Sequence, residues 1–161
     1  MHPRAAELIQ VLGLEPHPEG GHFVEAFRST LAVSPADARG QRSALTLIYF
    51  LLIRGSVSRW HRVLSDEAWH WYEGAPLELL TVGPGGGSVS RTTLGPLSAS
   101  ARPLHVVLAG HWQAARPCGD YTLVGCSVGP GFDYADFVML RALPESQRPL
   151  LSPASDFAEF L

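Results

Sequence analysis

Short β-prone segments recur along most of the chain, and glycine or proline residues separate them. Such segments at regular spacing, with helical periodicity confined to the ends of the chain, predict an antiparallel β-sandwich or barrel. Apolar residues at helical spacing predict one short helix over 5–12, and 156–161 is expected to add a last helical turn. The predicted strands are 22–29, 44–53, 57–62, 67–73, 77–82, 88–93, 104–109, 121–128 and 135–140.

The glycine-rich stretch 83–87, Gly-Pro-Gly-Gly-Gly, is the clearest turn signal in the chain. A phosphate-binding loop would use such glycines too, but it needs the N-terminus of a helix directly after them. The residues that follow, 88–93, are β-prone instead. We therefore interpret this stretch as the turn of a β-hairpin.

A single domain accounts for the whole chain. Its 161 residues are enough to bury a core, and no repeat or linker interrupts them. We expect one domain over 1–161, with its core at about 12–142 and a C-terminal tail rich in proline and serine at 143–161.

Composition argues against two classes of partner. All twelve basic residues are arginines scattered along a chain of net charge −3, so no basic stripe is present and nucleic-acid binding is not expected. The longest apolar run, 44–53, is much shorter than the roughly 20 residues of a membrane-spanning helix. The N-terminus lacks the apolar region of a signal peptide. We expect a cytoplasmic protein with Cys118 and Cys126 as free thiols.

The stretch 58–74, SRWHRVLSDEAWHWYEG, concentrates the side chains able to do chemistry. It holds two histidines, two adjacent acids and three tryptophans. These groups can bind a metal, move a proton or stack on a small organic ring. This stretch is therefore the expected centre of a functional site inside a β scaffold.

The same stretch resembles the first sequence motif of the cupins. That motif has a glycine, a His-x-His pair, a glutamate a few residues on, and then six residues before a second glycine. Gly55, His61, Glu67 and Gly74 fit this pattern, whereas Arg59 stands in place of the first histidine. The second cupin motif, Pro-x-Gly-x2-His, is similar to the sequence LAGHWQ, in which Gln113 stands where the histidine would fall.

Four blocks of the chain resemble the Cupin_5 family, a family of small cupins with no established reaction. They are 12–29, 61–74, 108–115 and 123–137. The resemblance implies a mainly β double-stranded β-helix, or jelly-roll barrel, with a short N-terminal helix and a minor C-terminal one. It also implies membership of the RmlC-like superfamily, to which the dTDP-keto-sugar epimerases belong, and assembly as a homodimer.

A metal site is one interpretation of these residues. His61 and Glu67, completed by His70 or Gln113, would make a ligand set for one divalent transition metal (Fe, Zn, Mn or Ni) with positions open for substrate. The alternative is a site without metal, in which Glu67 pairs with Arg59 or with Arg62.

Strand alternation separates some of these candidates. If Glu67 points inward, Trp69 and Trp71 share its face and His70 points away, unless a bulge between Asp66 and Trp69 reunites Glu67 with His70. The tryptophans would then either fill the core or stack on a flat ligand.

His61 is also a candidate base. A histidine beside arginines titrates near neutrality and could take a proton next to a carbonyl group, as the sugar epimerases of the superfamily do without metal. An acid partner would be needed, and Tyr121 and Tyr134 are candidates by residue type. The alternative is a histidine held only by structural hydrogen bonds.

Two further charged residues are candidates for ligand binding. Glu19, in the rigid turn PHPEGG, is expected at the mouth of the site. Arg28 would suit a carboxylate or phosphate on the ligand if it faced inward, and otherwise lies at the surface. Strict alternation places Glu25 and Arg28 on opposite faces of their strand.

Together these patterns predict a small-molecule enzyme of cupin type. Its substrate would be a polar, sugar-like metabolite, and its reaction an isomerisation, an epimerisation or metal-dependent chemistry, with His61 and Glu67 as catalytic residues. The alternative is a cupin that binds or senses a small ligand without turnover.

Overall fold

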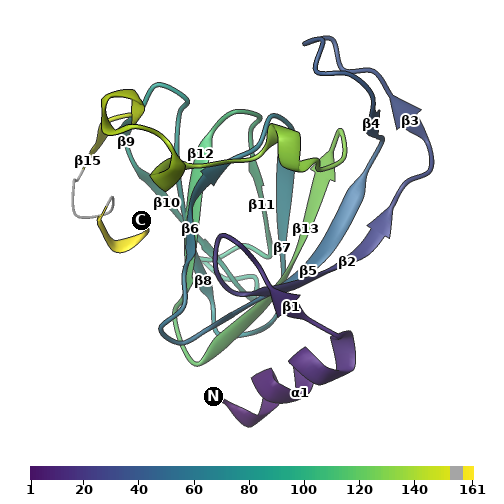
Figure 1. Ribbon diagram of the computed structural model, residues 1–161. Helices are drawn as coiled ribbons and strands as arrows, with labels where there is room; N and C mark the ends of the chain where they lie inside the picture. Colours follow the sequence, from purple (N-terminus) through teal and green to yellow (C-terminus); the bar gives the residue numbers. More distant parts are fainter. Residues whose placement is uncertain (153–157) are drawn as a thin grey trace.

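The computed structural model describes residues 1–152 and 158–161. Two antiparallel β-sheets face each other, and over the described residues they pack face to face rather than closing into one continuous barrel (Figure 1). This is the jelly-roll arrangement that the sequence predicted. The six-stranded sheet has the order β1-β2-β5-β13-β7-β11 and the five-stranded sheet the order β10-β8-β12-β6-β14.

The bounds of the elements follow, sheet by sheet. The six-stranded sheet contains β1 (Glu15–Pro16), β2 (His22–Arg28), β5 (Thr46–Ile53), β13 (Tyr121–Gly129), β7 (Asp66–Gly74) and β11 (Leu104–Val107). The five-stranded sheet contains β10 (Ser90–Leu94), β8 (Leu77–Val82), β12 (Trp112–Pro117), β6 (Ser58–Arg62) and β14 (Val138–Met139). Two small sheets pair β3 (Ala32–Val33) with β4 (Arg42–Ser43) and β9 (Gly87–Ser88) with β15 (Leu151–Ser152). The 3-10 helices are η1 (Tyr134–Asp136), η2 (Leu140–Ala142) and η3 (Glu145–Gln147).

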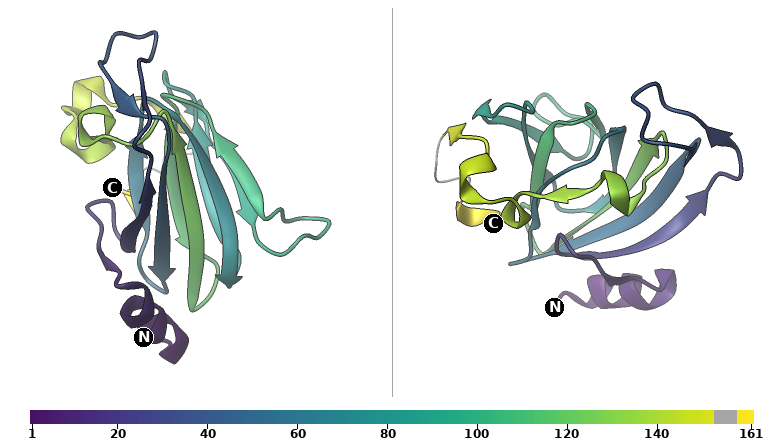
Figure 2. Two further views of the ribbon diagram at one scale, coloured as in Figure 1. Left: turned by 90° about the vertical axis from the view of Figure 1, so that its right-hand side faces the viewer. Right: turned by 45° about the horizontal axis from the view of Figure 1, so that its top comes forward.

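The predicted helix is present as α1 (Pro3–Leu12). Pro3 occupies its first turn, where a missing N–H costs nothing, and Gly13 ends it in the left-handed conformation with φ 65°. Ala5 and Leu8 pack on Leu51 and Leu123, on the outer face of the six-stranded sheet. Figure 2 shows α1 at one end of this sheet and the β3–β4 hairpin projecting from the other.

The predicted hairpin at 83–87 is confirmed. It connects β8 to β9 and β10, and the Gly86 amide donates to the Gly83 carbonyl at 2.9 Å. Gly86 has φ 86°, and a Cβ there would lie 2.5 Å from the Leu150 carbonyl oxygen. The glycine therefore supplies both a backbone angle and a close approach.

Two parts of the strand prediction were wrong. Strand β12 was missed because its alanines and proline are poor strand formers, yet it pairs with β6 and β8 and its first four residues are buried. Residues 135–140 were predicted as one strand but form the end of η1, the two-residue strand β14 and the start of η2. The predicted turn at 156–161 begins outside the described residues, and Ala158 and Glu159 are helical.

The space between the sheets is divided in two. One end is a packed core that includes Phe50, Leu52, Trp69 and Leu79, and the other end is the pocket described below. A second apolar cluster, which includes Trp60 and Trp112, contacts Phe160 near the C-terminus. No helix within the described residues is long and apolar enough to cross a membrane.

Candidate functional site

A pocket of about 610 Å³ opens between the sheets. Its walls come from the segment before β2, from β2, β5, β13 and β7 of the six-stranded sheet, from β6 of the facing sheet, and from the residues around η1. Four polar residues that line it are almost inaccessible to solvent: Glu19, Thr46, His61 and Glu67. The two residues predicted to be catalytic, His61 and Glu67, therefore meet in one cavity.

A β-bulge in β6 brings His61 into this pocket. On β12, Gln113 pairs with His61 and Ala115 pairs with Ser58, so two residues of β6 stand opposite one residue of β12. Ser58 and His61 are three positions apart and would face opposite ways in a regular strand. With the bulge, both contact Glu19: the Ser58 hydroxyl donates to its Oε1 at 2.9 Å, and His61 Nε2 lies 3.1 Å from its Oε2.

Glu19 and His61 must share a proton. His61 Nδ1 lies 2.7 Å from the Arg59 carbonyl oxygen, which can only accept, so Nδ1 carries a hydrogen. The other ring nitrogen, Nε2, faces the Glu19 carboxyl group at 3.1 Å. If Glu19 holds the proton between these two atoms, the carboxyl group and the imidazole are both neutral. If His61 holds it, a carboxylate faces an imidazolium.

Burial favours the neutral form of both groups. Burial raises the pKa of Glu19 to about 7, although His17 and the Ser58 hydroxyl oppose this shift. Burial also lowers the pKa of His61, against the nearby charge of Glu67 and the hydrogen bond to the Arg59 carbonyl. Both shifts favour the arrangement in which Glu19 holds the proton and His61 Nε2 accepts its hydrogen bond.

The PHPEGG turn carries Glu19 further inside than the sequence predicted. Gly20 has φ 112°, and a Cβ there would collide with the Val57 carbonyl oxygen. The Arg59 amide donates to the Glu19 carbonyl at 2.9 Å, and its guanidinium reaches the same oxygen at 3.2 Å. Arg59, which stands in place of the first cupin histidine, does not line the pocket but holds the backbone of Glu19.

Glu67 is positioned by a chain of directional hydrogen bonds. Trp69 Nε1 donates to Gln113 Oε1 at 2.9 Å, so the amide of Gln113 must direct its Nε2 toward Glu67 Oε2, at 2.6 Å. The Cys126 thiol also hydrogen-bonds the Glu67 carboxyl group. Burial raises the pKa of Glu67, and His61 opposes the shift. Glu67 is therefore a base with a pKa above its ordinary value.

Only some of the predicted metal ligands come together: His61 and Glu67 share the pocket and Gln113 contacts Glu67, but His70 lies elsewhere. Strand β7 alternates regularly from Glu67 to Trp71, and its irregularity lies beyond them, opposite Leu123 and Val124. His70 consequently faces away from Glu67 and lies 3.2 Å from the Ser127 hydroxyl. The oxygen of Gln113 already accepts from Trp69. The described residues include no group of three or more His, Cys, Asp or Glu side chains arranged to hold a metal, so the predicted ligand set does not fit this arrangement.

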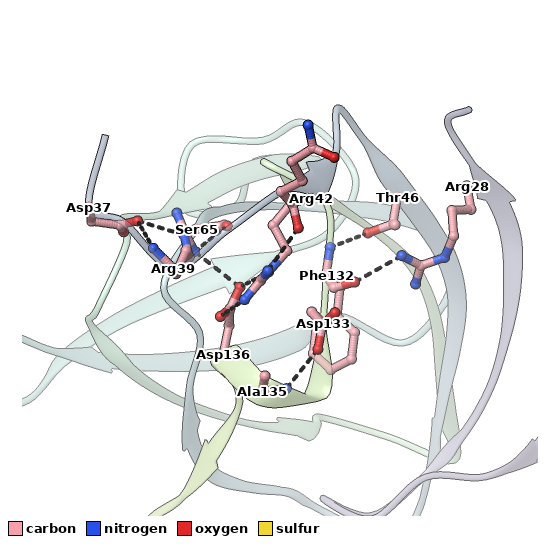
Figure 3. A network of polar contacts seen from close by, with 11 residues as sticks. Arg28, Asp37, Arg39, Arg42, Thr46, Ser65, Phe132, Asp133, Ala135 and Asp136 are labelled. Carbon is pink, nitrogen blue, oxygen red and sulfur yellow. Dashed lines mark hydrogen bonds and ion pairs between the residues drawn. The ribbon is translucent and has the colours of Figure 1, made fainter. Parts of the chain in front are cut away.

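Arg28 does face the pocket, but it is already paired. A register shift between Glu25 and Phe27 places Glu25 and Arg28 on the same face of β2, where strict alternation would separate them. Arg28 makes a bidentate pair with Glu25, at 2.9 and 2.7 Å. It also donates to the Phe132 carbonyl at 3.0 Å (Figure 3). Its guanidinium is therefore not free for a ligand anion.

The aromatic candidates divide between core and pocket. Trp69 is in the core, the Trp71 indole donates to the Ala75 carbonyl, and neither lines the pocket. Tyr134 lies at the pocket rim, 57% exposed, whereas Tyr121 lies elsewhere and donates to Glu73. The aromatic lining that the sequence interpretation missed consists of His17, Phe23, Phe132 and Phe137.

A network of ion pairs supports the wall around η1 (Figure 3). Arg42, from β4, holds Asp136 with two hydrogen bonds of 2.8 and 2.7 Å, and Arg39 approaches the same carboxylate at 3.3 Å. Hydrogen bonds from Arg42 lower the pKa of Asp136. On the other side, the Phe132 amide donates to the Thr46 hydroxyl at 2.9 Å. Residues 132–137 are thus fixed at both ends.

Comparison with known proteins is consistent with this architecture. The sequence profile of Cupin_5, described as Cupin superfamily (DUF985), matches residues 6–140. A protein from Shewanella oneidensis is 32% identical, with a TM-score of 0.80 over 97% of this chain and 96% of that one. A hypothetical protein from Leishmania major is 32% identical, with a TM-score of 0.78 over 83% and 85%. Oxalate decarboxylase from Bacillus subtilis, 13% identical with a TM-score of 0.58 over 89% of this chain and 34% of that one, shares the fold alone. No curated protein matches the chain significantly.

Proposed function

The chain belongs to the Cupin_5 family of the cupin superfamily, and we propose that it is an enzyme that isomerises or epimerises a polar hydroxy-carbonyl metabolite by proton transfer. The observation that carries this proposal is the proton that Glu19 and His61 must share inside the pocket. A second carboxyl group, Glu67, lines the same pocket and is held by Gln113 as a hydrogen-bond acceptor. The site therefore offers one group that gives a proton and another that takes one.

These roles give a balanced reaction. Glu67 removes a proton from the carbon next to the carbonyl group, while the Glu19–His61 pair gives its proton to the carbonyl oxygen, which forms an enediol. Glu67 then returns its proton to the former carbonyl carbon, and the pair regains a proton from the hydroxyl group on the carbon that Glu67 first deprotonated. The product is the isomeric carbonyl compound, and the reaction needs no oxidant or reductant. Carboxyl groups whose pKa values are raised by burial suit this task.

Solvent exchange of carbon-bound hydrogen tests the proposal. Keto-sugars and ammonium-bearing hydroxy-ketones would be incubated with the protein in D2O, and the loss of the C–H signal adjacent to the carbonyl followed by proton NMR. We expect exchange with the wild type and a fall of about 10²-fold or more in Glu19→Gln, His61→Asn and Glu67→Gln. His70→Asn, on the opposite face of β7 from Glu67, is the matched control and should exchange at the wild-type rate.

The alternative is a cupin that binds a small ligand without turnover. Calorimetry with the same compounds distinguishes the two functions. Tight binding with no hydrogen exchange in any bound compound would replace the enzyme by a binding protein. Exchange that persists unchanged in His61→Asn would instead remove the role given to the Glu19–His61 pair.

Assembly and location are also proposals. The outer face of the six-stranded sheet exposes Tyr72, Leu104 and Val106, which supports a homodimer formed through this face. Light scattering after gel filtration should give twice the chain mass, and a monomer would contradict the proposal. Both cysteines are free, as the sequence predicted, which supports a reducing, cytoplasmic location.

A further inference from the structure

We propose that the pocket recognises an organic cation, a ligand whose ammonium group lies at the rim between aromatic rings and carboxylates. This inference rests on the proposed function for the identity of the site and deepens it by naming the class of substrate. It comes from the charge of the pocket lining, from the aromatic rings around η1 and from the depth at which each group lies.

Acidic residues are concentrated in the pocket lining. Five of the fifteen Asp and Glu residues in the chain line it, against one of the twelve arginines. That arginine, Arg28, is already neutralised by Glu25 through two hydrogen bonds. With Glu19 protonated, the lining still holds Glu15, Glu67 and Asp133, whereas its one arginine, Arg28, is paired with Glu25 and also interacts with Asp133. A cleft with this balance repels an anion and attracts a cation.

The nearest other arginines do not cancel this charge. Arg42 pairs with Asp136 at 2.7 Å, and Arg39 lies 3.1 Å from Asp37 as well as 3.3 Å from Asp136. Neither arginine lines the pocket. Their charges are therefore largely matched behind the wall, and the negative potential remains on its pocket side.

Aromatic rings complete the site. Phe132, Tyr134 and Phe137 form a cluster with ring centroids 5.0 to 6.1 Å apart and interplanar angles of 64° to 84°. Rings at such steep angles direct their faces in different directions along one wall, and Phe23 adds another ring to the lining. A cation is attracted to the faces of aromatic rings, whereas a hydroxyl group or an anion gains little from them. Neither the acids nor the rings alone would select an ammonium group, but their combination does.

The depth of the groups orients the ligand. Glu15, Asp133 and Tyr134 are exposed at the rim, whereas Glu19, His61 and Glu67 are buried. A charged ammonium group placed at the rim keeps part of its hydration and gains both rings and carboxylates. The opposite end of the same molecule then reaches the proton-transfer groups.

Matched probes test the selectivity for charge. Calorimetric titration would compare choline with its neutral isostere, in which a tert-butyl group replaces trimethylammonium, and with gluconate as an anion. We expect choline to bind about 10-fold or more tightly than the isostere, gluconate not to bind measurably, and choline affinity to fall with added salt. Choline binding no better than its isostere would overturn the proposal, and so would preferential binding of gluconate.

Three variants assign the selectivity to this wall. Tyr134→Leu, Phe132→Leu and Asp133→Asn should each weaken choline by about 3- to 30-fold while changing the affinity of the neutral isostere much less. Tyr72→Leu, which removes an exposed aromatic ring on the outer sheet face, is the control and should leave choline affinity unchanged. Tyr134 is 57% exposed, so its variant should fold even if Phe132→Leu does not. Unchanged choline affinity in both Tyr134→Leu and Asp133→Asn would contradict the proposed site.

The hydrogen-exchange experiment separates this inference from the proposed function. Charge-selective binding without hydrogen exchange would support the organic-cation ligand and contradict the proposed enzyme activity. Hydrogen exchange on neutral keto-sugars, with no preference for choline over its isostere, would support the proposed enzyme activity and contradict the organic-cation ligand.

Discussion

Two buried carboxyl groups in this molecule have opposite electrostatic environments. Glu19 faces His61 and His17, and burial raises its pKa to about 7. Asp136 faces Arg42 and Arg39, and their hydrogen bonds lower its pKa. Both side chains are nearly inaccessible, so burial alone does not decide the protonation state. The partner decides: a permanently charged guanidinium stabilises the carboxylate, whereas a neutral imidazole does not.

This difference gives the two carboxyl groups different roles: Asp136 supports the structure, and Glu19 is suited to chemistry. The Asp136 pair links the β3–β4 hairpin to the residues after β13, and thereby holds the aromatic pocket wall. A carboxylate fixed by two arginines has no proton to give at neutral pH. Glu19 keeps its proton within reach of His61, which suits it to chemistry and contributes less to rigidity.

The largest expected effect is on stability, and it distinguishes the two carboxyl groups directly. Asp136→Asn leaves the Arg42 guanidinium without its counter-charge and Arg39 with Asp37 alone, so we expect the free energy of unfolding at pH 7 to fall by about 3 kcal/mol. Glu19→Gln keeps a donor facing His61 Nε2, as the protonated acid does, and should change stability by less than about 1 kcal/mol. Chemical denaturation with urea measures both.

Asp133→Asn is the matched control for Asp136→Asn. Asp133 is exposed in the same segment and accepts from the Ala135 amide at 2.8 Å, and asparagine caps equally well. Its effect should therefore stay below about 0.5 kcal/mol. Equal losses in Asp136→Asn and Glu19→Gln would show that the two carboxyl groups do not differ as described.

Regular strand alternation made part of this architecture predictable. The strand spacing predicted an antiparallel sandwich or barrel, and the resemblance to the cupins implied the jelly roll. Alternation along β7 correctly placed Glu67 and Trp69 on one face. It failed wherever a bulge occurs, since one extra residue reverses the faces of all that follow. Bulges place Ser58 with His61 and Glu25 with Arg28, and each depends on packing between distant strands.

Glu19 illustrates a second limit of the sequence. Its neighbours, two prolines before it and two glycines after it, did indicate a special turn. The depth of that turn depends on contact with Val57 and on hydrogen bonds from Arg59, forty residues away in the chain. A sequence can suggest that an acid between turn residues is functional, but its partner becomes known only when both segments are placed.

The pH dependence of stability is a further prediction, and its expected effect is of intermediate size. The raised pKa of Glu19 contributes stability that is present below its unfolded value of about 4.5 and lost as the pH rises to about 7. The lowered pKa of His61 contributes stability that is present above about 6.5 and lost as the pH falls through its folded value. In the wild type these two trends oppose each other just below pH 6.5.

Replacing Glu19 or His61 should reveal the pH dependence of stability that the other residue causes. Glu19→Gln should lose stability as the pH falls below about 6.5, and His61→Asn should lose it as the pH rises from about 4.5 to 7, each by about 1.4 kcal/mol for every unit of the remaining pKa shift. Urea denaturation at several pH values measures both slopes. Parallel slopes in the two variants would contradict the shared proton. Asp136, by contrast, loses its contribution only as the pH falls through its folded pKa, below 3.8.

The smallest expected effect is that of added metal. His61 Nε2 already faces Glu19, the oxygen of Gln113 accepts from Trp69, and His70 faces away from the pocket, which leaves Glu67 without the partners of a ligand set. Loading with Zn²⁺, Mn²⁺, Ni²⁺ or Fe²⁺ followed by desalting should therefore leave well under one equivalent bound by elemental analysis, and should raise Tm by less than about 1 °C. One equivalent retained by the wild type and lost in His61→Asn would show that Glu19 moves aside for a metal. Glu19 would then resemble Asp136 more closely, because a cation would keep its carboxyl group in the charged form.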